Sequence, residues 1–182
     1  MSDISESVIS YEVMEAIKQN KGFAVIFAGS DSDRPHIDKL SAALKEYQVP
    51  HQVRICSAHK QPEALQKLVG AYDSMGTLAY IAVAGGTDAL SGTASFHSIN
   101  PVISCPPDAP NDTCLRNPPG SSNAYIPNPK NAARFVAQMF SHLPDTPYRR
   151  LLEAEKTKKV LALEKADGEL SKFPYQPQEV KK

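Results

Sequence analysis

The apolar residues of this chain fall into short runs that are separated by longer segments with a helical period. Four short runs are rich in apolar or β-branched residues and predict strands at 23–28, 51–56, 78–84 and 101–105. The first of them, FAVIFA, is apolar throughout, which is typical of a strand that is covered on both faces. A fifth short strand is expected at 124–126.

Helical patterns follow these strands. After Pro35, which suits a first helical turn, Ile37, Leu40 and Leu44 recur on one face. Similar patterns predict helices from 62 to about 72, across 90–99, and from 129 to about 140. Alternating strands and helices joined by short turns predict a parallel sheet with right-handed crossovers, which is a three-layer α/β/α fold.

Three segments lie outside this alternation. Residues 7–20 predict a leading helix, and 148–170 predict a Lys- and Glu-rich helix with a few apolar positions, which we expect to pack on another subunit. Residues 106–123 hold five prolines and predict a long loop, whereas 173–182 predict a frayed end. The expected organisation is a leading helix, a central domain and a C-terminal helix with its tail: 1–21, 22–145 and 146–182.

Composition excludes several classes of partner. Lys plus Arg and Asp plus Glu both number 20, so the chain has no net charge to attract nucleic acid or an anionic membrane. Three cysteines without CxxC spacing predict reduced thiols rather than a disulfide framework or a zinc site. No stretch suggests a signal peptide or a membrane span. We therefore expect a cytoplasmic protein with no membrane or nucleic-acid partner.

Small and polar residues gather in three of the turns that lead from a strand into a helix. These turns are GSDSD at 29–33, SAHK at 57–60 and GGTD at 85–88. In a parallel sheet such turns meet at the carboxyl ends of the strands, where ligands bind. The sequence therefore predicts a small-molecule site at this edge. No Walker loop, G-x-S-x-G elbow or paired zinc cysteines occur, so no metal or cofactor is predicted.

The first turn offers both hydroxyls and carboxylates. Ser30 and Ser32, with the N-terminus of the following helix, could donate hydrogen bonds to a phosphate. Asp31 and Asp33 would repel a phosphate, but one of them could accept hydrogen bonds from a ribose diol. Asp33 could instead only cap the helix, and the spacing alone leaves both interpretations open.

The second turn contains the candidate for proton transfer. His59 lies at a strand end, and a histidine can take and return a proton near neutral pH. Alternatively, His59 is an ordinary surface residue and Ser57 only a helix cap. The other histidines lie in or beside helices, where structural roles are expected: His36, His51, His97 and His142. In the third turn, Gly85 and Gly86 either make room for a ligand or form a tight turn.

The ordered set of motifs resembles the aminoimidazole ribonucleotide (AIR) carboxylase family of purine biosynthesis. GSDSD, SAHK, AGG, VISCPP, PPG and PKNAA occur in sequence between about Phe23 and about Leu143. The resemblance implies a flavodoxin-like fold and a cofactor-free homo-oligomer, a tetramer or an octamer, with each active site at a subunit junction. The substrate would be 5-aminoimidazole ribonucleotide, which carbon dioxide carboxylates at C4.

The resemblance also implies roles for individual residues. His59 would move the C4 proton. Phosphate and ribose would be held by Ser30, Ser32 and Asp33, and the carbon dioxide pocket would be shaped by Gly85 and Gly86. The other residues that we expect to bind substrate are Asp31, Ser57, Ala58, Lys60, Thr87, Leu90, Ser91, Arg116 and Gly120.

Two classes of this family differ in their motifs. The mutase class, which rearranges N5-carboxyaminoimidazole ribonucleotide, typically has SAHR and GGAAHLPG, and the direct carboxylase class has SAHK, AGRSNALSG and SCPP. Lys60, the ALSG of 89–92 and the SCPP of 104–107 match the carboxylase class. Ala89 stands where the mutase class has a second histidine. Direct carboxylation is therefore our expectation, with the mutase reaction as the alternative.

The chain departs from the carboxylase pattern at several positions. Gly86 replaces the arginine of AGRSN and Asp88 its asparagine, the loop after SCPP is shorter, and NPPG replaces MPSG. These changes keep two further alternatives open: a non-catalytic homologue that binds the ribonucleotide, and a carboxylase for a different heterocycle.

Overall fold

Five parallel strands form one sheet in the order β2-β1-β3-β4-β5. The computed structural model describes residues 9–108 and 110–174. Its strands are β1 (Phe23–Ala28), β2 (His51–Ile55), β3 (Leu78–Val83), β4 (Val102–Ser104) and β5 (Ala124–Tyr125). All five lie within a residue or two of the predicted runs, and the predicted parallel sheet is confirmed.

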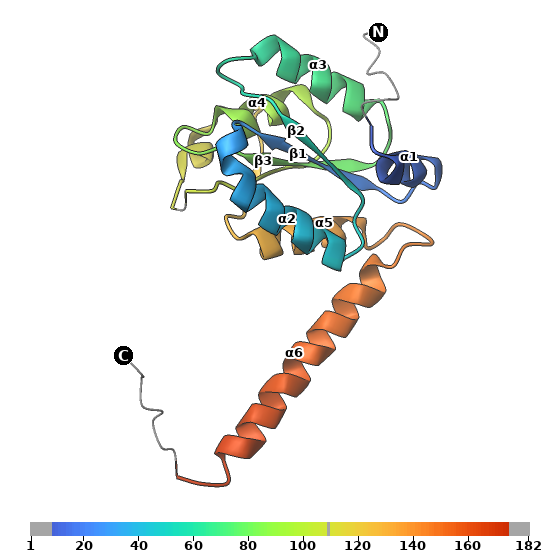
Figure 1. Ribbon diagram of the computed structural model, residues 1–182, viewed down its shortest axis with the longest axis vertical. Coiled ribbons are helices and arrows are strands. Elements are labelled where there is room, and N and C mark those ends of the chain that lie inside the picture. Colours follow the sequence, from blue (N-terminus) through green and yellow to red (C-terminus); the bar gives the residue numbers. More distant parts are fainter. Residues whose placement is uncertain (1–8, 109, 175–182) are drawn as a thin grey trace.

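Helices cover both faces of this sheet, with α3 and α4 on one side and α2 and α5 on the other (Figure 1). The α-helices are α1 (Tyr11–Lys18), α2 (Arg34–Glu46), α3 (Pro62–Asp73), α4 (Ala89–His97), α5 (Pro129–Phe140) and α6 (Tyr148–Leu170). Two short 3₁₀ helices are η2 (Asp31–Asp33) and η3 (Thr113–Arg116). The expected flavodoxin-like α/β/α fold is confirmed.

The residues of strand β1 explain why helices must cover both faces of the sheet. All six of its residues are buried, and alternate side chains enter different cores. Ala24, Ile26 and Ala28 belong to the core that also contains apolar residues of α2 and α5. Phe23, Val25 and Phe27 belong to the core formed with α1, α3 and α4. Side chains of a strand alternate between its faces, so a strand that is apolar at every position needs a layer on each side.

Two helices are shorter than the apolar pattern predicts. The leading helix was expected from residue 7, but Ser10 accepts a hydrogen bond from the Val13 N–H and caps a helix that begins at Tyr11. Positions 7 and 8 lie outside the described residues, as does 175–182 of the predicted frayed end. Helix α4 ends at His97 rather than 99 because Ser98 has an extended backbone. The predicted loop of 106–123 contains one helical turn, η3.

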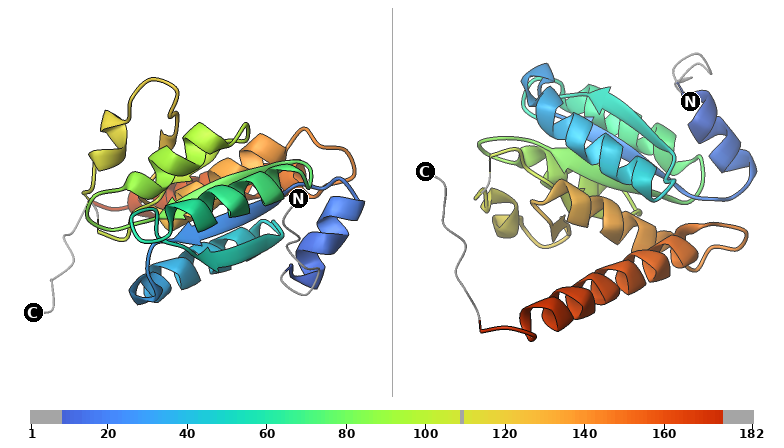
Figure 2. Two further views of the ribbon diagram at one scale, coloured as in Figure 1. Left: turned by 90° about the horizontal axis from the view of Figure 1, so that it is seen from above. Right: turned by 60° about the horizontal axis from the view of Figure 1, so that its bottom comes forward.

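Helix α6 extends away from the rest of the protein (Figures 1 and 2). Its base is anchored: the buried Tyr148 donates a hydrogen bond to the Lys21 carbonyl at 3.0 Å. Two turns further, Glu155 accepts hydrogen bonds from the Tyr47 hydroxyl at 2.7 Å and from the Arg134 Nε at 3.2 Å. Beyond this point the side chains are largely exposed, several apolar ones included.

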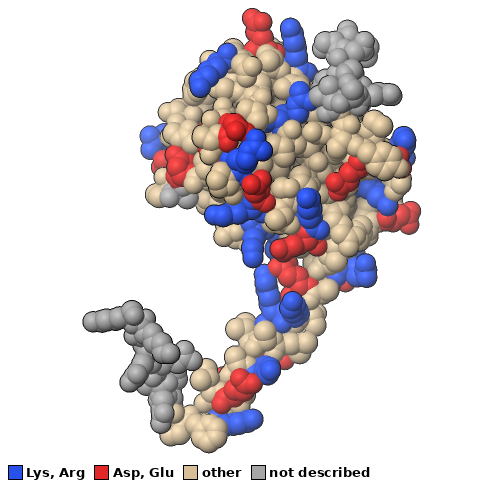
Figure 3. All heavy atoms as spheres, viewed as in Figure 1, with Lys and Arg blue, Asp and Glu red and all other residues tan. Residues whose placement is uncertain are grey.

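The visible surface mixes both signs of charge (Figure 3). Lys, Arg, Asp and Glu side chains are interspersed over the globular part and along α6. Within the described residues, no helix has the length and apolar character needed to cross a membrane.

Candidate functional site

A pocket of about 360 Å³ lies where the turns after β1, β2 and β3 meet. Its wall is formed by Gly29, Ser30, Ser32, Asp33, Ser57, Ala58, His59, Lys60, Ala84, Gly85, Thr87 and Leu90. Residues from all three predicted turns therefore share one cavity. In a 2-1-3-4-5 sheet, β1 and β3 mark the point where the strand order reverses, which is the usual ligand crevice of such folds.

The serines of the first turn are hydrogen-bonded to each other. The Ser30 hydroxyl oxygen accepts from the Ser32 N–H at 3.2 Å and from the Ser32 hydroxyl at 2.8 Å. Both serines line the pocket, whereas Asp31 does not line it and forms an ion pair with Arg34. The turn thus presents hydroxyl groups to the cavity and directs one carboxylate away from it.

The alternative role of Asp33, capping the following helix with its side chain, is wrong. It occupies the N-cap position of α2, but its side chain makes no capping hydrogen bond. Burial raises the pKa of the Asp33 carboxyl above its ordinary value, and repulsion by Asp108 adds to this shift. His36 and a Ser30 backbone hydrogen bond act in the opposite direction. Asp33 is therefore a half-buried carboxylate with room to accept hydrogen bonds from a ligand.

The second turn presents His59 to the pocket. The Ser57 hydroxyl oxygen accepts from the Lys60 N–H at 3.3 Å, and the Ser57 carbonyl accepts from the Gln61 N–H at 2.8 Å. Gln61 is the N-cap of α3, so the suggestion that Ser57 caps the helix is wrong. The exposed His59 ring has no hydrogen-bond partner within the described residues, which leaves both ring nitrogens available.

The third turn is held by the loop that follows β4. The Asp108 carboxylate accepts a hydrogen bond from the Gly86 N–H at 2.7 Å, and the Asn111 side-chain amide donates to the Gly86 carbonyl at 2.8 Å. Gly86 has a φ of +67°, a conformation that favours glycine. Asp108 also lies 3.5 Å from the position that a Cβ of Gly85 would occupy. Asp108 was not among the predicted site residues, although it lies just past the end of a fourth strand, where the same rule on strand ends applies.

The last residue of this turn, Asp88, has a buried carboxylate that links the turn to neighbouring elements. Asp88 accepts hydrogen bonds from the Ser91 N–H at 2.9 Å, from the Ser91 hydroxyl at 2.8 Å and from the Ser104 hydroxyl. The Asp88 N–H in turn donates to the Thr113 hydroxyl at 2.9 Å. Asp88 thus joins α4, β4 and the loop, and this network uses the Ser91 hydroxyl that was predicted to contact substrate.

Some predicted substrate-binding residues lie outside the pocket of this single chain. Asp31, Gly86, Ser91, Arg116 and Gly120 are not part of its wall. Arg116 is exposed and forms an ion pair with Asp112 at 3.4 Å.

The structural interpretation holds for three of the other histidines. Within hydrogen-bond distance, His36 lies beside Cys105, His51 beside Ser41 and His97 beside Gln66. Burial raises the pKa of the Cys105 thiol to about 12, so this sulfur is not a reactive thiolate. In the described part of the chain, no group of three His, Cys, Asp or Glu side chains is placed to hold a metal ion.

These features define a flavodoxin-like α/β protein with a polar small-molecule pocket at the switch point of its sheet. Comparison with known families makes the class specific: the family model described as AIR carboxylase matches residues 24–160. The chain belongs to this family, whose enzymes act on AIR and its carboxylated form in purine biosynthesis.

Individual relatives agree with this assignment. The chain is 36% identical to the phosphoribosylaminoimidazole carboxylase of Treponema denticola over 126 residues, which are 64% of this chain and 78% of the relative. It is 34% identical to the N5-carboxyaminoimidazole ribonucleotide mutase of Pyrococcus horikoshii over 91 residues, which are 50% and 51% of the two chains. The crystal structure of Treponema denticola PurE superposes with a TM-score of 0.75 and 30% identity, covering 82% of this chain and 98% of that one.

Proposed function

We propose that this protein carboxylates 5-aminoimidazole ribonucleotide at C4 with carbon dioxide, and that His59 carries the C4 proton. The observation that supports this most is the shared pocket, which brings the imidazole, the serine-aspartate turn and the glycine turn together. Hydroxyls suit a phosphate, a carboxylate suits a ribose diol, and a glycine wall leaves space for a small neutral gas molecule.

In this reaction the electron-rich C4 of the ring attacks the carbon of carbon dioxide. A C4–carbon bond forms while one C–O π bond opens to give the carboxylate. The C4–H bond then breaks, its electrons restore the aromatic ring, and the proton passes to His59. Solvent takes the proton from the exposed imidazole. Ser30, Ser32 and Asp33 would hold the phosphate and ribose so that C4 faces His59.

The direct carboxylase is favoured over the mutase by two of its motif residues. Lys60 occupies the last position of SAHK and lines the pocket, and Ala89 stands in place of the second mutase histidine. One feature favours the mutase instead, since Gly86 continues a Gly-Gly pair like that of GGAAHLPG. The mutase therefore remains the second candidate.

A paired-substrate assay separates the two activities. In the first arm, the enzyme receives AIR with bicarbonate as a source of carbon dioxide. In the second arm, it receives N5-carboxyaminoimidazole ribonucleotide without ATP. We expect the C4-carboxylated product at a higher rate in the first arm. Faster product formation in the second arm would overturn this assignment in favour of the mutase. Ribonucleotide binding by calorimetry without turnover in either arm would identify a non-catalytic homologue.

We further propose that the active protein is a homo-oligomer, a tetramer or an octamer. Helix α6 leaves Val160, Leu161, Leu163 and Leu170 between 44% and 72% exposed, which is unusual for one helix of a monomer. At a junction between copies, Arg116 and Gly120 of one copy could also line the pocket of its neighbour. Light scattering coupled to size-exclusion chromatography measures the mass of the assembly, and a monomer at assay concentration would contradict the proposal.

A further inference from the structure

Asp108 brings a negative charge close to the glycine turn of the pocket, where the carboxylase-class motif has an arginine. Its carboxylate lies 3.5 Å from the position that a Cβ of Gly85 would occupy, and Gly85 is part of the pocket wall. The carbonyl and N–H of Gly86 are both engaged by the loop after β4, through Asn111 and Asp108 respectively. Gly86 replaces an arginine of the carboxylase motif, and this loop is the segment that is shorter than expected. The two departures therefore meet in one contact, in which the carboxylate of an acidic loop residue accepts a hydrogen bond from Gly86, a residue without a side chain.

The Asp108 carboxylate is fixed rather than free to swing. One oxygen accepts from the Gly86 N–H at 2.7 Å and the other from the Asn111 side-chain amide at 3.0 Å. Asn111 is itself 6% exposed and donates to the Gly86 carbonyl at 2.8 Å. Burial alone would raise the pKa of the Asp108 carboxyl, but these two hydrogen bonds outweigh it and lower the pKa below its ordinary value. A carboxylate held in this way stays ionised at neutral pH.

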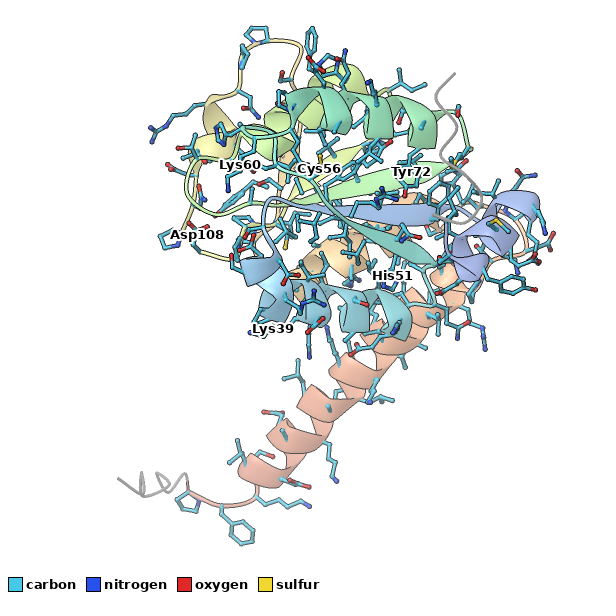
Figure 4. All side chains as sticks on the ribbon, turned by 45° about the horizontal axis from the view of Figure 1, so that its top comes forward. Lys39, His51, Cys56, Lys60, Tyr72 and Asp108 are labelled. Atoms are coloured by element: carbon cyan, nitrogen blue, oxygen red, sulfur yellow. The ribbon has the colours of Figure 1, made fainter. Side chains whose placement is uncertain are left out.

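The charges of the pocket are separated across the sheet. Lys60 follows β2, whereas Asp108 follows β4, and β1 and β3 lie between these strands. Strands lie about 4.8 Å apart, so the roots of the two turns are roughly 14 Å apart. Figure 4 shows Lys60 and Asp108 at the same end of the sheet. The Asp33 carboxylate lies close enough to the Asp108 carboxylate for the two to repel each other, which raises the pKa of Asp33. Lys60 thus lines one side of the pocket, whereas on the other side Asp108 lies against Gly85 of the wall without lining the pocket itself.

We propose that Asp108 is a specificity-determining residue that disfavours a carboxylate against the glycine wall of the pocket. This inference rests on the proposed function, because it concerns how the same site distinguishes the unsubstituted ribonucleotide from its C4-carboxylated form. Neutral carbon dioxide can lie against Gly85 beside Asp108 without electrostatic penalty. Once the carboxylate has formed there, like-charge repulsion weakens its binding, and the product leaves more readily.

Binding measurements in a catalytically silent background test this proposal. Calorimetry on His59→Asn and on His59→Asn/Asp108→Asn gives Kd values for AIR and for the C4-carboxylated ribonucleotide. Removing the negative charge should tighten binding of the carboxylated form by roughly three- to tenfold, as expected for one like-charge contact near water. The affinity for AIR should change little, and higher ionic strength should shrink the difference because it screens exposed charges.

Three matched variants separate charge from structure. Asp108→Glu keeps the charge and should keep the wild-type ratio of the two Kd values. Asn111→Ala loosens the loop without changing its charge, and it should change both Kd values by the same factor. Asp38→Asn removes an exposed carboxylate of α2 and should leave both unchanged.

The possible outcomes distinguish this inference from the proposed function. An unchanged Kd ratio in Asp108→Asn would overturn the role of Asp108 while leaving the carboxylase assignment intact. So would a change of the Kd ratio in Asn111→Ala as large as that in Asp108→Asn. Failure of either ribonucleotide to bind the His59→Asn protein or the wild type would instead overturn the proposed function on which the inference rests.

Discussion

Polar side chains at the two ends of the sheet differ in how many hydrogen bonds they make within the protein. At the amino ends of the strands, the Asp73 carboxylate is saturated with hydrogen bonds. Its four donors are the Tyr80 hydroxyl at 2.8 Å, the Ser98 hydroxyl at 2.8 Å, the Asn100 amide at 3.0 Å and the Ile99 N–H at 3.2 Å. At the carboxyl ends, neither His59 nor Lys60 has a side-chain partner within the described residues.

The difference follows from what each end must do. Tyr80 is fully buried, so its hydroxyl needs partners inside the protein, and burial together with Asp73 raises its pKa. An unsatisfied buried polar group would cost stability. His59 and Lys60 at the pocket are instead exposed to water, which a ligand can replace. Unpaired polar side chains therefore indicate function at one end, whereas paired ones indicate structure at the other.

The largest expected effect is the loss of catalysis on replacing His59. His59→Asn keeps a similar shape but cannot carry the proton, so we expect the rate of C4 carboxylation to fall about 10²- to 10⁴-fold. The exposed ring contributes little to folding, so the melting temperature should stay close to that of the wild type. Product formation and thermal unfolding are measured on the same preparation. Undiminished turnover would remove His59 from the mechanism.

Replacing Asp73 should lower the stability of the protein and leave its catalytic rate unchanged. Asp73→Ala removes the acceptor of the Asn100 amide and of the Ile99 N–H. The Ser98 hydroxyl keeps only the Asn100 carbonyl at 3.5 Å, and the Tyr80 hydroxyl only the Val69 carbonyl at 3.0 Å. We expect the free energy of unfolding to drop by about 2–4 kcal/mol, while turnover per folded molecule stays at the wild-type level. Urea denaturation gives the first quantity. A loss of turnover without a loss of stability would contradict the division between the two ends.

Two helix glycines sharpen the comparison. A Cβ at Gly92 of α4 would lie 2.7 Å from the Asn117 Oδ1, whereas a Cβ at the exposed Gly70 of α3 would meet nothing within 4 Å. Gly92→Ala should therefore displace the Asn117 side chain, disturb its 2.7 Å hydrogen bond to the Asn123 Oδ1 and cost about 1–2 kcal/mol of unfolding free energy. Gly70→Ala is the matched control and should gain about 0.5–1 kcal/mol. Chemical denaturation of both variants measures the difference, and equal effects would argue against a tight contact at Gly92.

The smallest expected effect is the contribution of Asp33 to the pH dependence of the free energy of unfolding. Because the folded state raises its pKa above 3.8, the folded protein binds more protons than the unfolded chain between that value and the raised one. Stability therefore falls as pH rises through this window. Asp33→Asn should abolish this slope and stabilise the protein at pH 7 by less than about 1 kcal/mol, while weakening ribonucleotide binding. Unfolding curves across the acidic range measure it, and a variant less stable than wild type at pH 7 would contradict it.

The local sequence was sufficient for the elements and for three turns of the site. Runs such as 23–28 are apolar at every position, and only a strand between two layers can bury them in this way. The turns at 29–33, 57–60 and 85–88 could be placed at one edge because parallel strands all end on the same side. The exact ends of helices were harder to predict, because they depend on caps such as Ser10 rather than on the apolar period.

Contacts between distant segments could not be predicted in the same way. Asp108 meets Gly86 across 22 positions of sequence, and the folding of a proline-rich loop decides whether they touch. The chain by itself determined the strand and helix pattern, the family motifs and His59 as the candidate proton carrier. Only the tertiary structure decided that the Asp33 side chain caps no helix, that the Ser91 hydroxyl is bonded to Asp88, and that Asp108 lies against Gly85 of the pocket wall. Such contacts depend on side chains that the fold brings together, and neither propensity nor spacing encodes them.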